Sequence, residues 1–328
     1  MSLSALREAI AGVLFCPRCT AQLVIEDAET HVRCTACQRI YPIREGIVMF
    51  LHGETANQEE ERRFRDAVAA EHMQRDREAL WEVVSQHHCV PIMLKQAEEF
   101  RARLKPHEWI LDIGIGWGWH WVEHREGAKI IGVDMSLGNL MIARRLLANQ
   151  DHRVVLVWAD AAALPIRNRA VAGVWSVQVF QHFPQNVFLR VQAELDRVLQ
   201  DEFVIELYNL NPALLYKIIF RALGKPLQGK IGQLELIRLS AKEWTDAWRK
   251  FRDGRVTISH GYSEMFFHPN FRLRPQRYPV RLERVLAERF PRLAAIFARQ
   301  VQVSVEAQKA GSLVPRLQAP RAGSVTRF

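Results

Sequence analysis

Long apolar segments are missing from this sequence of 328 residues. Its longest apolar runs, at 129–135 and 212–224, stop well short of the roughly 20 residues that a membrane-spanning helix needs. The N-terminus also lacks the basic region and apolar core of a secretion signal. These absences predict a cytoplasmic protein.

Cysteine is scarce, and four of the five cysteines form two CxxC pairs, Cys16 with Cys19 and Cys34 with Cys37. So few cysteines exclude the disulfide framework of a small secreted domain. Each pair can turn two thiolates toward one ion, and four thiolates complete the tetrahedral shell of Zn²⁺. We therefore predict a structural zinc site with no open position for catalysis; a redox-active dithiol is the alternative. The fifth, Cys89, is expected to be a small buried residue.

The charge is unbalanced toward the basic side, with 45 Lys and Arg against 36 Asp and Glu, a net charge of +9 and a pI of about 9.6. Such an excess favours anionic partners such as nucleic acid, anionic lipid, a phosphorylated sugar or a nucleotide cofactor. Much of it is arginine within 271–299. The alternative is a solvated basic face without a partner.

Changes in composition divide the chain into five parts. A β-rich cysteine module at 1–53 precedes a charged, helical connector at 54–105. Strands alternate with helices over 106–209, which predicts an α/β core with a doubly wound, mostly parallel sheet. Helices and the last strands occupy 210–310, and 311–328 has the composition of a flexible tail.

Glycine is concentrated in one place, where Gly114, Gly116 and Gly118 follow a predicted strand that contains Asp112. Because glycine weakens strands and helices, this spacing indicates a turn at which a ligand approaches the backbone, with a helix to follow. The third glycine comes one residue too early for a dinucleotide loop. An acid before the first glycine is unfavourable near a pyrophosphate and favourable near a cationic amino acid.

Over about residues 95–210 the chain resembles the class I S-adenosylmethionine-dependent methyltransferases, whose first motif has this acid and glycine pattern. The resemblance implies a seven-stranded sheet and the cofactor S-adenosylmethionine. It places Asp134 on the ribose hydroxyls, Asp160 beside the adenine and Gln178 beneath the sulfonium. Taken singly, Asp134 could cap a helix and Asp160 could sit in a turn. The implied cofactor-binding residues are Asp112, Gly114, Gly116, Gly118, Asp134, Met135, Asp160, Ala161 and Gln178.

The cysteine module has a resemblance of its own. With residues 37–51 it is similar to the small zinc-ribbon proteins that partner and activate tRNA, rRNA and protein methyltransferases. The resemblance implies an activator fused in front of its enzyme. A zinc domain before the same catalytic fold is also similar to bacterial enzymes that methylate guanine in ribosomal RNA. RNA is therefore one predicted partner.

Two further questions are which residue removes the proton from the acceptor and which kind of molecule receives the methyl group. Histidine suits removal of a hydroxyl proton near neutral pH, and we predict His182 as the general base, with His120 second; packing is the alternative for His182. Residues 173–183 resemble segments of methyltransferases that act on quinones, lipids and sugars.

We therefore expect a small-molecule, lipid-linked or saccharide acceptor, with O-methylation favoured and residues 210–310 as a helical lid. RNA methylation is the first alternative and a non-catalytic scaffold the second. The basic segment at 271–299 could also lie on an anionic membrane surface, with the protein peripheral to the inner face of the membrane.

Overall fold

The structure is a computed structural model. It describes residues 3–26, 30–51, 56–86, 90–124, 126–150, 153–210, 230–231, 234–235, 239–252, 254–261 and 300–307, with a few positions between 218 and 290. The predicted tail, Cys89, most of the predicted lid and most of 271–299 lie outside these residues.

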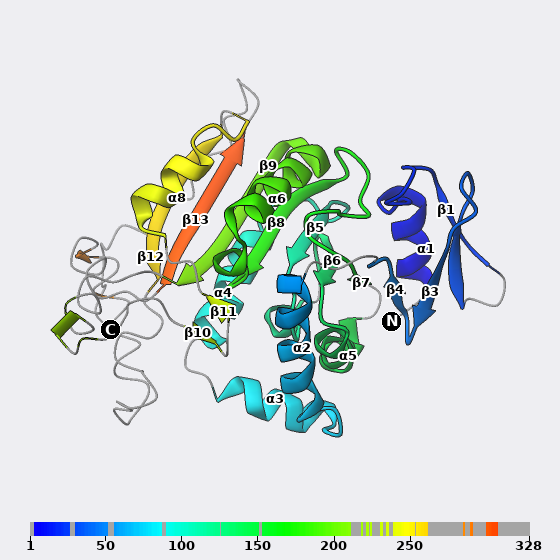
Figure 1. Cartoon of the computed structure of the whole chain (residues 1–328), viewed down its shortest axis with the longest axis horizontal. Helices are drawn as coiled ribbons and strands as arrows, with labels where there is room; N and C mark the ends of the chain where they lie inside the picture. The colour runs from blue at the N-terminus through cyan, green and yellow to red at the C-terminus, as the bar shows by residue number, and fades with distance from the viewer. Residues whose placement is uncertain are drawn as a thin grey trace, which may run out of the picture.

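One large mixed sheet organises the described part of the chain (Figure 1). Its strand order is β1-β2-β3-β4-β7-β6-β5-β8-β9-β13-β12. The strands β5 to β9 are parallel to one another, and β13 is antiparallel to both β9 and β12. The bounds are β1 Leu23–Ile25, β2 His31–Cys34, β3 Ile40–Arg44, β4 Ile47–Met49, β5 Trp109–Ile113, β6 Lys129–Asp134, β7 Val154–Trp158, β8 Val171–Val177, β9 Leu199–Leu210, β12 Arg255–Gly261 and β13 Gln300–Ala307. A separate hairpin joins β10 Lys230–Ile231 to β11 Leu234–Glu235.

The cysteine module extends the predicted seven-stranded sheet rather than standing apart from it. Strand β4 pairs in parallel with β7, with Met49 opposite Trp158. The backbone N–H groups of Phe50 and Leu51 then both donate to the Trp158 carbonyl, at 2.9 and 3.0 Å. Strand β7 would otherwise be an exposed edge, which sheet proteins avoid. The sheet therefore has eleven strands, seven from the predicted core and four from the module.

Helices cover both faces of the sheet. One face packs against α4, α5 and η1, and its core includes Phe100, Leu140 and Trp175. The other face packs against α1, α6 and α8, with Leu6 and Trp244 in its core. Helices α2 and α3 form an outer layer on α5. The bounds are α1 Leu3–Gly12, α2 Ala56–Ala70, α3 Arg77–Ser85, α4 Val90–Arg101, α5 Leu137–Leu146, α6 Gln185–Val198, α8 Ala241–Trp248, η1 Trp119–Trp121, η2 Ala148–Gln150 and η3 Phe180–His182. No helix among the described residues is long and apolar enough to cross a bilayer.

The prediction of a helix after the glycine turn was wrong. In the described residues between β5 and β6 the chain forms only the short 3-10 helix η1. Gly116 and Gly118 have positive φ, which an α-helix does not accommodate, and the Trp121 side chain turns inward to the core. Helix α4 of the predicted connector lies against η1 instead.

Candidate functional site

The glycine turn leaves open space at one of its three glycines. Gly114, Gly116 and Gly118 all have left-handed backbones, with φ of 66°, 56° and 69°. A Cβ at Gly114 would come within 2.3 Å of a Val179 methyl, and one at Gly118 within 2.6 Å of a Leu147 methyl. At Gly116 the nearest atom would be 3.9 Å away, so packing does not explain this glycine. The turn thus offers a ligand a cradle of bare backbone at Gly116.

Asp112, just before the turn, is a buried carboxyl. Its Oδ2 accepts a hydrogen bond of 2.7 Å from the Trp121 indole N–H. Burial raises the pKa of Asp112 to about 8, the indole opposes this rise, and the neighbouring Asp134 carboxylate adds to it. A cationic group brought to this carboxyl would favour its charged form, which agrees with the sequence-based expectation of a cationic amino acid near the turn.

Asp134 ends β6 and lies directly on the glycine turn. Its Oδ2 accepts from the Gly116 backbone N–H and its Oδ1 from the Ser136 N–H, both at 2.8 Å. Burial raises its pKa to about 6, while these two N–H groups and the Arg65 charge work against the rise. Ser136, not Asp134, is the N-cap of α5, so helix capping does not account for this acid.

The third strand end contributes Asp160 and its neighbours. Asp160 Oδ1 accepts from the Ala162 N–H at 2.9 Å, which fixes the turn that contains Ala161. The Trp158 indole N–H donates to the Met135 carbonyl at 2.7 Å. This bond ties the end of β7 to the residue after β6. Because β5, β6 and β7 are parallel, Asp112, Asp134 and Asp160 come to the same edge of the sheet.

Gln178 follows β8 at the same edge and is held in a strained conformation. Its φ is 58°, in the left-handed region that non-glycine residues rarely adopt. Its backbone N–H donates to the Tyr208 carbonyl at 2.6 Å, and its side chain is exposed. Backbone strain of this kind costs about 1 to 3 kcal/mol and concentrates at functional sites.

His182 lies beneath helix α2 of the predicted connector. Its side chain is 10% exposed, with Nδ1 at 3.7 Å from Glu61 Oε2. Its Nε2 lies 3.2 Å from an amino group of Arg65. Burial lowers the pKa of His182, and Arg65 adds to that effect while Glu61 and a hydrogen bond to the Gln178 backbone oppose it.

Helix α2 crosses the carboxyl edge of the sheet from α5 to η3. At the α5 end, Asp66 Oδ1 accepts from the Ser136 hydroxyl at 2.6 Å and from the Gly138 N–H at 3.0 Å. A Cβ at Gly138 would be 2.8 Å from the Ala69 Cβ, so the two helices touch closely. With His182 contacted from the same helix and β5 lying between β6 and β8, α2 passes over the glycine turn.

Sequence reasoning missed this contribution of α2. The pairs Glu61 with Arg65 and Arg62 with Asp66 are ion pairs at i,i+4 spacing, a pattern that ordinarily marks a solvated helix face. Nothing in that spacing shows which of these charged side chains lie at the carboxyl ends of the strands. Only the docking of α2 on α5 shows it.

His120 is packed among aromatic rings. It is 8% exposed, and its ring stacks on Trp119 at 3.8 Å between centroids with the Trp175 ring 6.0 Å away. Burial lowers its pKa to about 3, so the imidazole stays neutral and is a weak proton acceptor. Trp117 instead packs against the His72 ring in a T-shaped arrangement, with 4.9 Å between the ring centroids.

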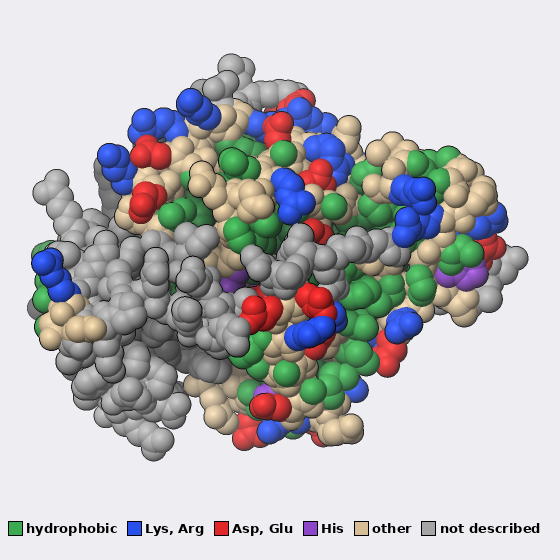
Figure 2. Space-filling model, viewed as in Figure 1, with side chains coloured by type: hydrophobic (Ala, Val, Ile, Leu, Met, Phe, Trp, Pro, Cys, Tyr) green, Lys and Arg blue, Asp and Glu red, His purple; other side chains and the backbone are tan. Residues whose placement is uncertain are grey.

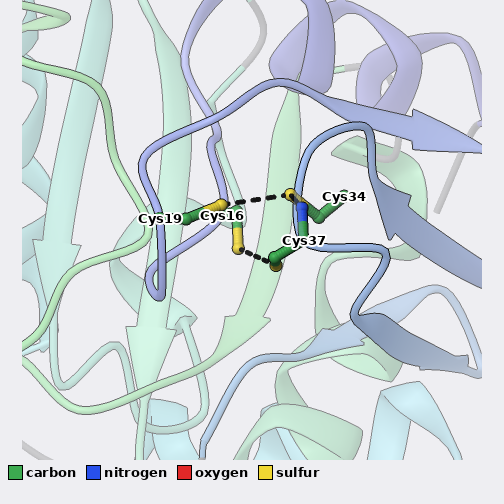
Figure 3. A group of neighbouring side chains, drawn as sticks. All are labelled: Cys16, Cys19, Cys34 and Cys37. Carbon is green, nitrogen blue, oxygen red and sulfur yellow. Dashed lines mark hydrogen bonds between the residues drawn. The ribbon is translucent and has the colours of Figure 1, made fainter.

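The four module cysteines converge on one point, as Figure 3 shows. All four sulfurs lie within 4.8 Å of one another, with Cys16 and Cys37 at 3.7 Å and Cys19 and Cys34 at 3.3 Å. Tetrahedral zinc with Zn–S bonds of about 2.3 Å needs sulfurs roughly 3.8 Å apart. The donor set therefore fits structural Zn²⁺ and leaves no open coordination position. The buried Tyr41 hydroxyl adds a contact of 3.1 Å to Cys16.

Two stretches of the chain match known families. Residues 110–202 match the methyltransferase domain family, and residues 12–46 match the Trm112p-like proteins. The chain therefore carries a methyltransferase domain behind a Trm112p-like domain, which confirms both resemblances. No curated protein sequence matches the chain.

Two solved structures are similar to this chain, and the first supports the fold. The geranyl diphosphate C-methyltransferase from Streptomyces coelicolor A3(2), in complex with Mg²⁺, geranyl diphosphate and S-adenosyl-L-homocysteine, is 15% identical with a TM-score of 0.51, over 79% of this chain and 100% of that chain. A complex that contains the Haloferax volcanii Trm112 methyltransferase activator is 17% identical with a TM-score of 0.48, over 76% of this chain and 98% of that chain.

Proposed function

We propose that this methyltransferase uses S-adenosylmethionine to methylate a small-molecule, lipid-linked or saccharide acceptor, with the acceptor atom an oxygen. The observation that carries the proposal is the passage of α2 over the glycine turn, which leaves His182 only 10% exposed. An acceptor must therefore fit beneath a helix, which suits a compact group better than a folded polymer. We expect the protein to act in the cytoplasm.

The residues at the sheet edge fit the cofactor by their chemistry. The bare backbone at Gly116 can take a closely approaching ligand, and the buried Asp112 beside it can take a cationic amino group. Asp134, whose carboxylate already accepts two N–H groups, is suited to ribose hydroxyls. Asp160 and Ala161, in the turn after β7, are suited to the adenine.

The cofactor supplies a methyl group already activated by its sulfonium, so the protein mainly orients the acceptor and removes its proton. We assign proton removal to Nε2 of His182. Burial keeps this imidazole neutral near pH 7, and the Glu61 charge opposes the lowering of its pKa and so supports its basicity. Burial lowers the pKa of His120 to about 3, so this ring is a weak proton acceptor.

RNA methylation is the alternative, and the Trm112p-like domain together with the net charge of +9 favours it. On the face that Figure 2 shows, the described Lys and Arg side chains are interspersed with Asp and Glu, while most of the basic segment 271–299 lies outside the described residues. A nucleic-acid groove ordinarily presents continuous positive charge.

The test measures cofactor binding and methyl transfer separately. Calorimetry with S-adenosylmethionine should show binding that is lost in Asp134→Ala, and unchanged affinity in that variant contradicts the ribose assignment. Radiolabelled methyl transfer is then assayed on RNA, lipid and polar metabolite fractions from producing cells, and label in the RNA fraction alone contradicts the small-acceptor proposal. Binding without transfer to any fraction points to the non-catalytic scaffold.

A further inference from the structure

The His182 ring is surrounded by groups that sequence reasoning did not connect with it. Glu61 and Arg65 reach it from α2, and the Gln178 backbone reaches it from the end of β8. Glu61 also pairs with Arg65, whose Nε lies 2.7 Å from Glu61 Oε1. We call these three side chains, Glu61, Arg65 and His182, the histidine cluster.

The contacts fix which ring nitrogen carries the proton. A guanidinium can only donate, so Nε2 of His182 must accept from Arg65 at 3.2 Å. The proton of the neutral ring then sits on Nδ1, which lies 3.7 Å from Glu61 Oε2. This distance is longer than a hydrogen bond, so the Glu61 carboxylate acts on the ring through its charge and stabilises the protonated form.

The contacts also show what Nε2 faces. The Arg65 guanidinium that meets Nε2 is close enough to Asp134 to lower that carboxyl's pKa. Nε2 therefore faces a guanidinium that acts on both His182, after β8, and Asp134, at the end of β6. The glycine turn follows β5, the strand that lies between β6 and β8. This edge of the sheet is where a methyl donor would lie.

We propose that Glu61 is the positioning residue for His182, and that Arg65 occupies the Nε2 position until the acceptor displaces it. The Glu61 charge attracts the Nδ1–H side of the ring, so that Nε2 faces the incoming hydroxyl. When Nε2 takes the hydroxyl proton, Glu61 stabilises the imidazolium that forms. The inference rests on the proposed function, since an oriented base matters only to an acceptor that loses a proton.

Docking of α2 would then assemble the base as well as cover the site. Asp66, next to Arg65 on the same helix, fixes the helix on α5 through the Ser136 hydroxyl and the Gly138 N–H. Glu61 and Arg65 are side by side on the face that meets η3. Undocking of α2 removes both from His182 together, so the ring is under the influence of Glu61 only in the closed site.

The test is a pH titration of the His182 ring by NMR on the full-length, zinc-loaded protein with labelled histidine. His182→Gln identifies the resonance. We expect Glu61→Gln to lower the His182 pKa and Arg65→Gln to raise it, each by roughly one unit for a charge at this distance. Glu60→Gln is the matched control, because Glu60 is the exposed neighbour on the same helix and should leave the pKa unchanged.

The direction of the Glu61→Gln shift separates positioning from structural damage. Loosened packing would expose His182 and raise its pKa, because burial is the main cause of the lowering. A raised or unchanged pKa in Glu61→Gln overturns the proposal. So does methyl transfer at the wild-type rate in Glu61→Gln when His182→Gln has lost it, and in that case the proposed function stands. A different outcome is that Glu61→Gln and Arg65→Gln shift the His182 pKa in opposite directions but the wild-type protein transfers no methyl group. That result overturns the proposed function, while the electrostatic effect of Glu61 and Arg65 on His182 stands.

Discussion

Alanine substitutions at Gly114 and Gly116 separate the packing role of the turn from its binding role. Both residues have a left-handed backbone, where alanine costs about 1 to 2 kcal/mol. At Gly114 the new methyl also meets Val179 at 2.3 Å, and overpacking of this kind adds roughly 1 to 3 kcal/mol. At Gly116 the new methyl meets only open space. Gly114→Ala should therefore lower the free energy of unfolding by about 2 to 5 kcal/mol, and Gly116→Ala by about 1 to 2.

Cofactor binding should show the opposite order. A methyl at Gly116 enters the space in which we place the cofactor, so Gly116→Ala should weaken S-adenosyl-L-homocysteine binding at least about tenfold, equivalent to roughly 1.4 kcal/mol. Urea unfolding followed by tryptophan fluorescence gives the stabilities, and calorimetry gives the affinities.

Val179→Ala provides the control for the clash. Combined with Gly114→Ala, it should restore the part of the free energy of unfolding that is lost to overpacking. The part lost to the left-handed backbone should remain, and a double-mutant cycle separates the two. Equal stabilities of Gly114→Ala and Gly116→Ala would refute the packing argument. Wild-type affinity in Gly116→Ala would refute the placement of the cofactor at the open side of the turn.

Other predictions concern metal, pH and the docking of α2. Zinc analysis should give about one ion per chain, and full retention of zinc in a Cys16→Ala, Cys34→Ala double variant would exclude the four-cysteine site. Removal of zinc by a chelator should also lower the melting temperature, because strand β4 of the module pairs with β7, the outermost strand of the parallel core. The pKa of Asp112 is raised to about 8 in the fold, so the folded protein retains a proton that the unfolded chain loses near pH 4. Stability should fall between pH 4 and 8, and Asp112→Asn should flatten that fall; an equal fall in both proteins contradicts the assignment. Asp66→Asn should weaken docking of α2 by about 1 kcal/mol, seen as faster hydrogen exchange in α2, and unchanged exchange would mean that its bond to Ser136 is dispensable.

The Trm112p-like domain has a structural consequence for the rest of the chain. Because β4 extends the sheet beyond β7, and residues 50 and 51 bond to the last residue of β7, the module meets the strand that leads to Asp160. Ion pairs add to the contact, with Glu45 bound to Arg144 at 2.7 Å. The zinc module and the methyltransferase core therefore share one hydrogen-bonded sheet.

Local sequence patterns alone determined the elements of this protein that depend on short-range geometry. The CxxC spacing predicted a four-sulfur site, because two residues between thiols suffice for both to reach one ion. Alternating strands and helices predicted the parallel core, and glycines after a strand predicted the turn. The order of Asp112, Asp134 and Asp160 predicted the shared edge, since parallel strands end on the same side.

Only the tertiary structure decided which charges reach that edge and which histidine they surround. Glu61 and Arg65 carry the same i,i+4 pattern as a solvated helix, and their contact with His182 spans 117 positions for Arg65. The structure likewise placed α4 where we had predicted a helix after the glycine turn, and joined the cysteine module to β7. The physical reason is common to all three: such contacts depend on the packing of whole elements, which leaves no periodicity in the local sequence.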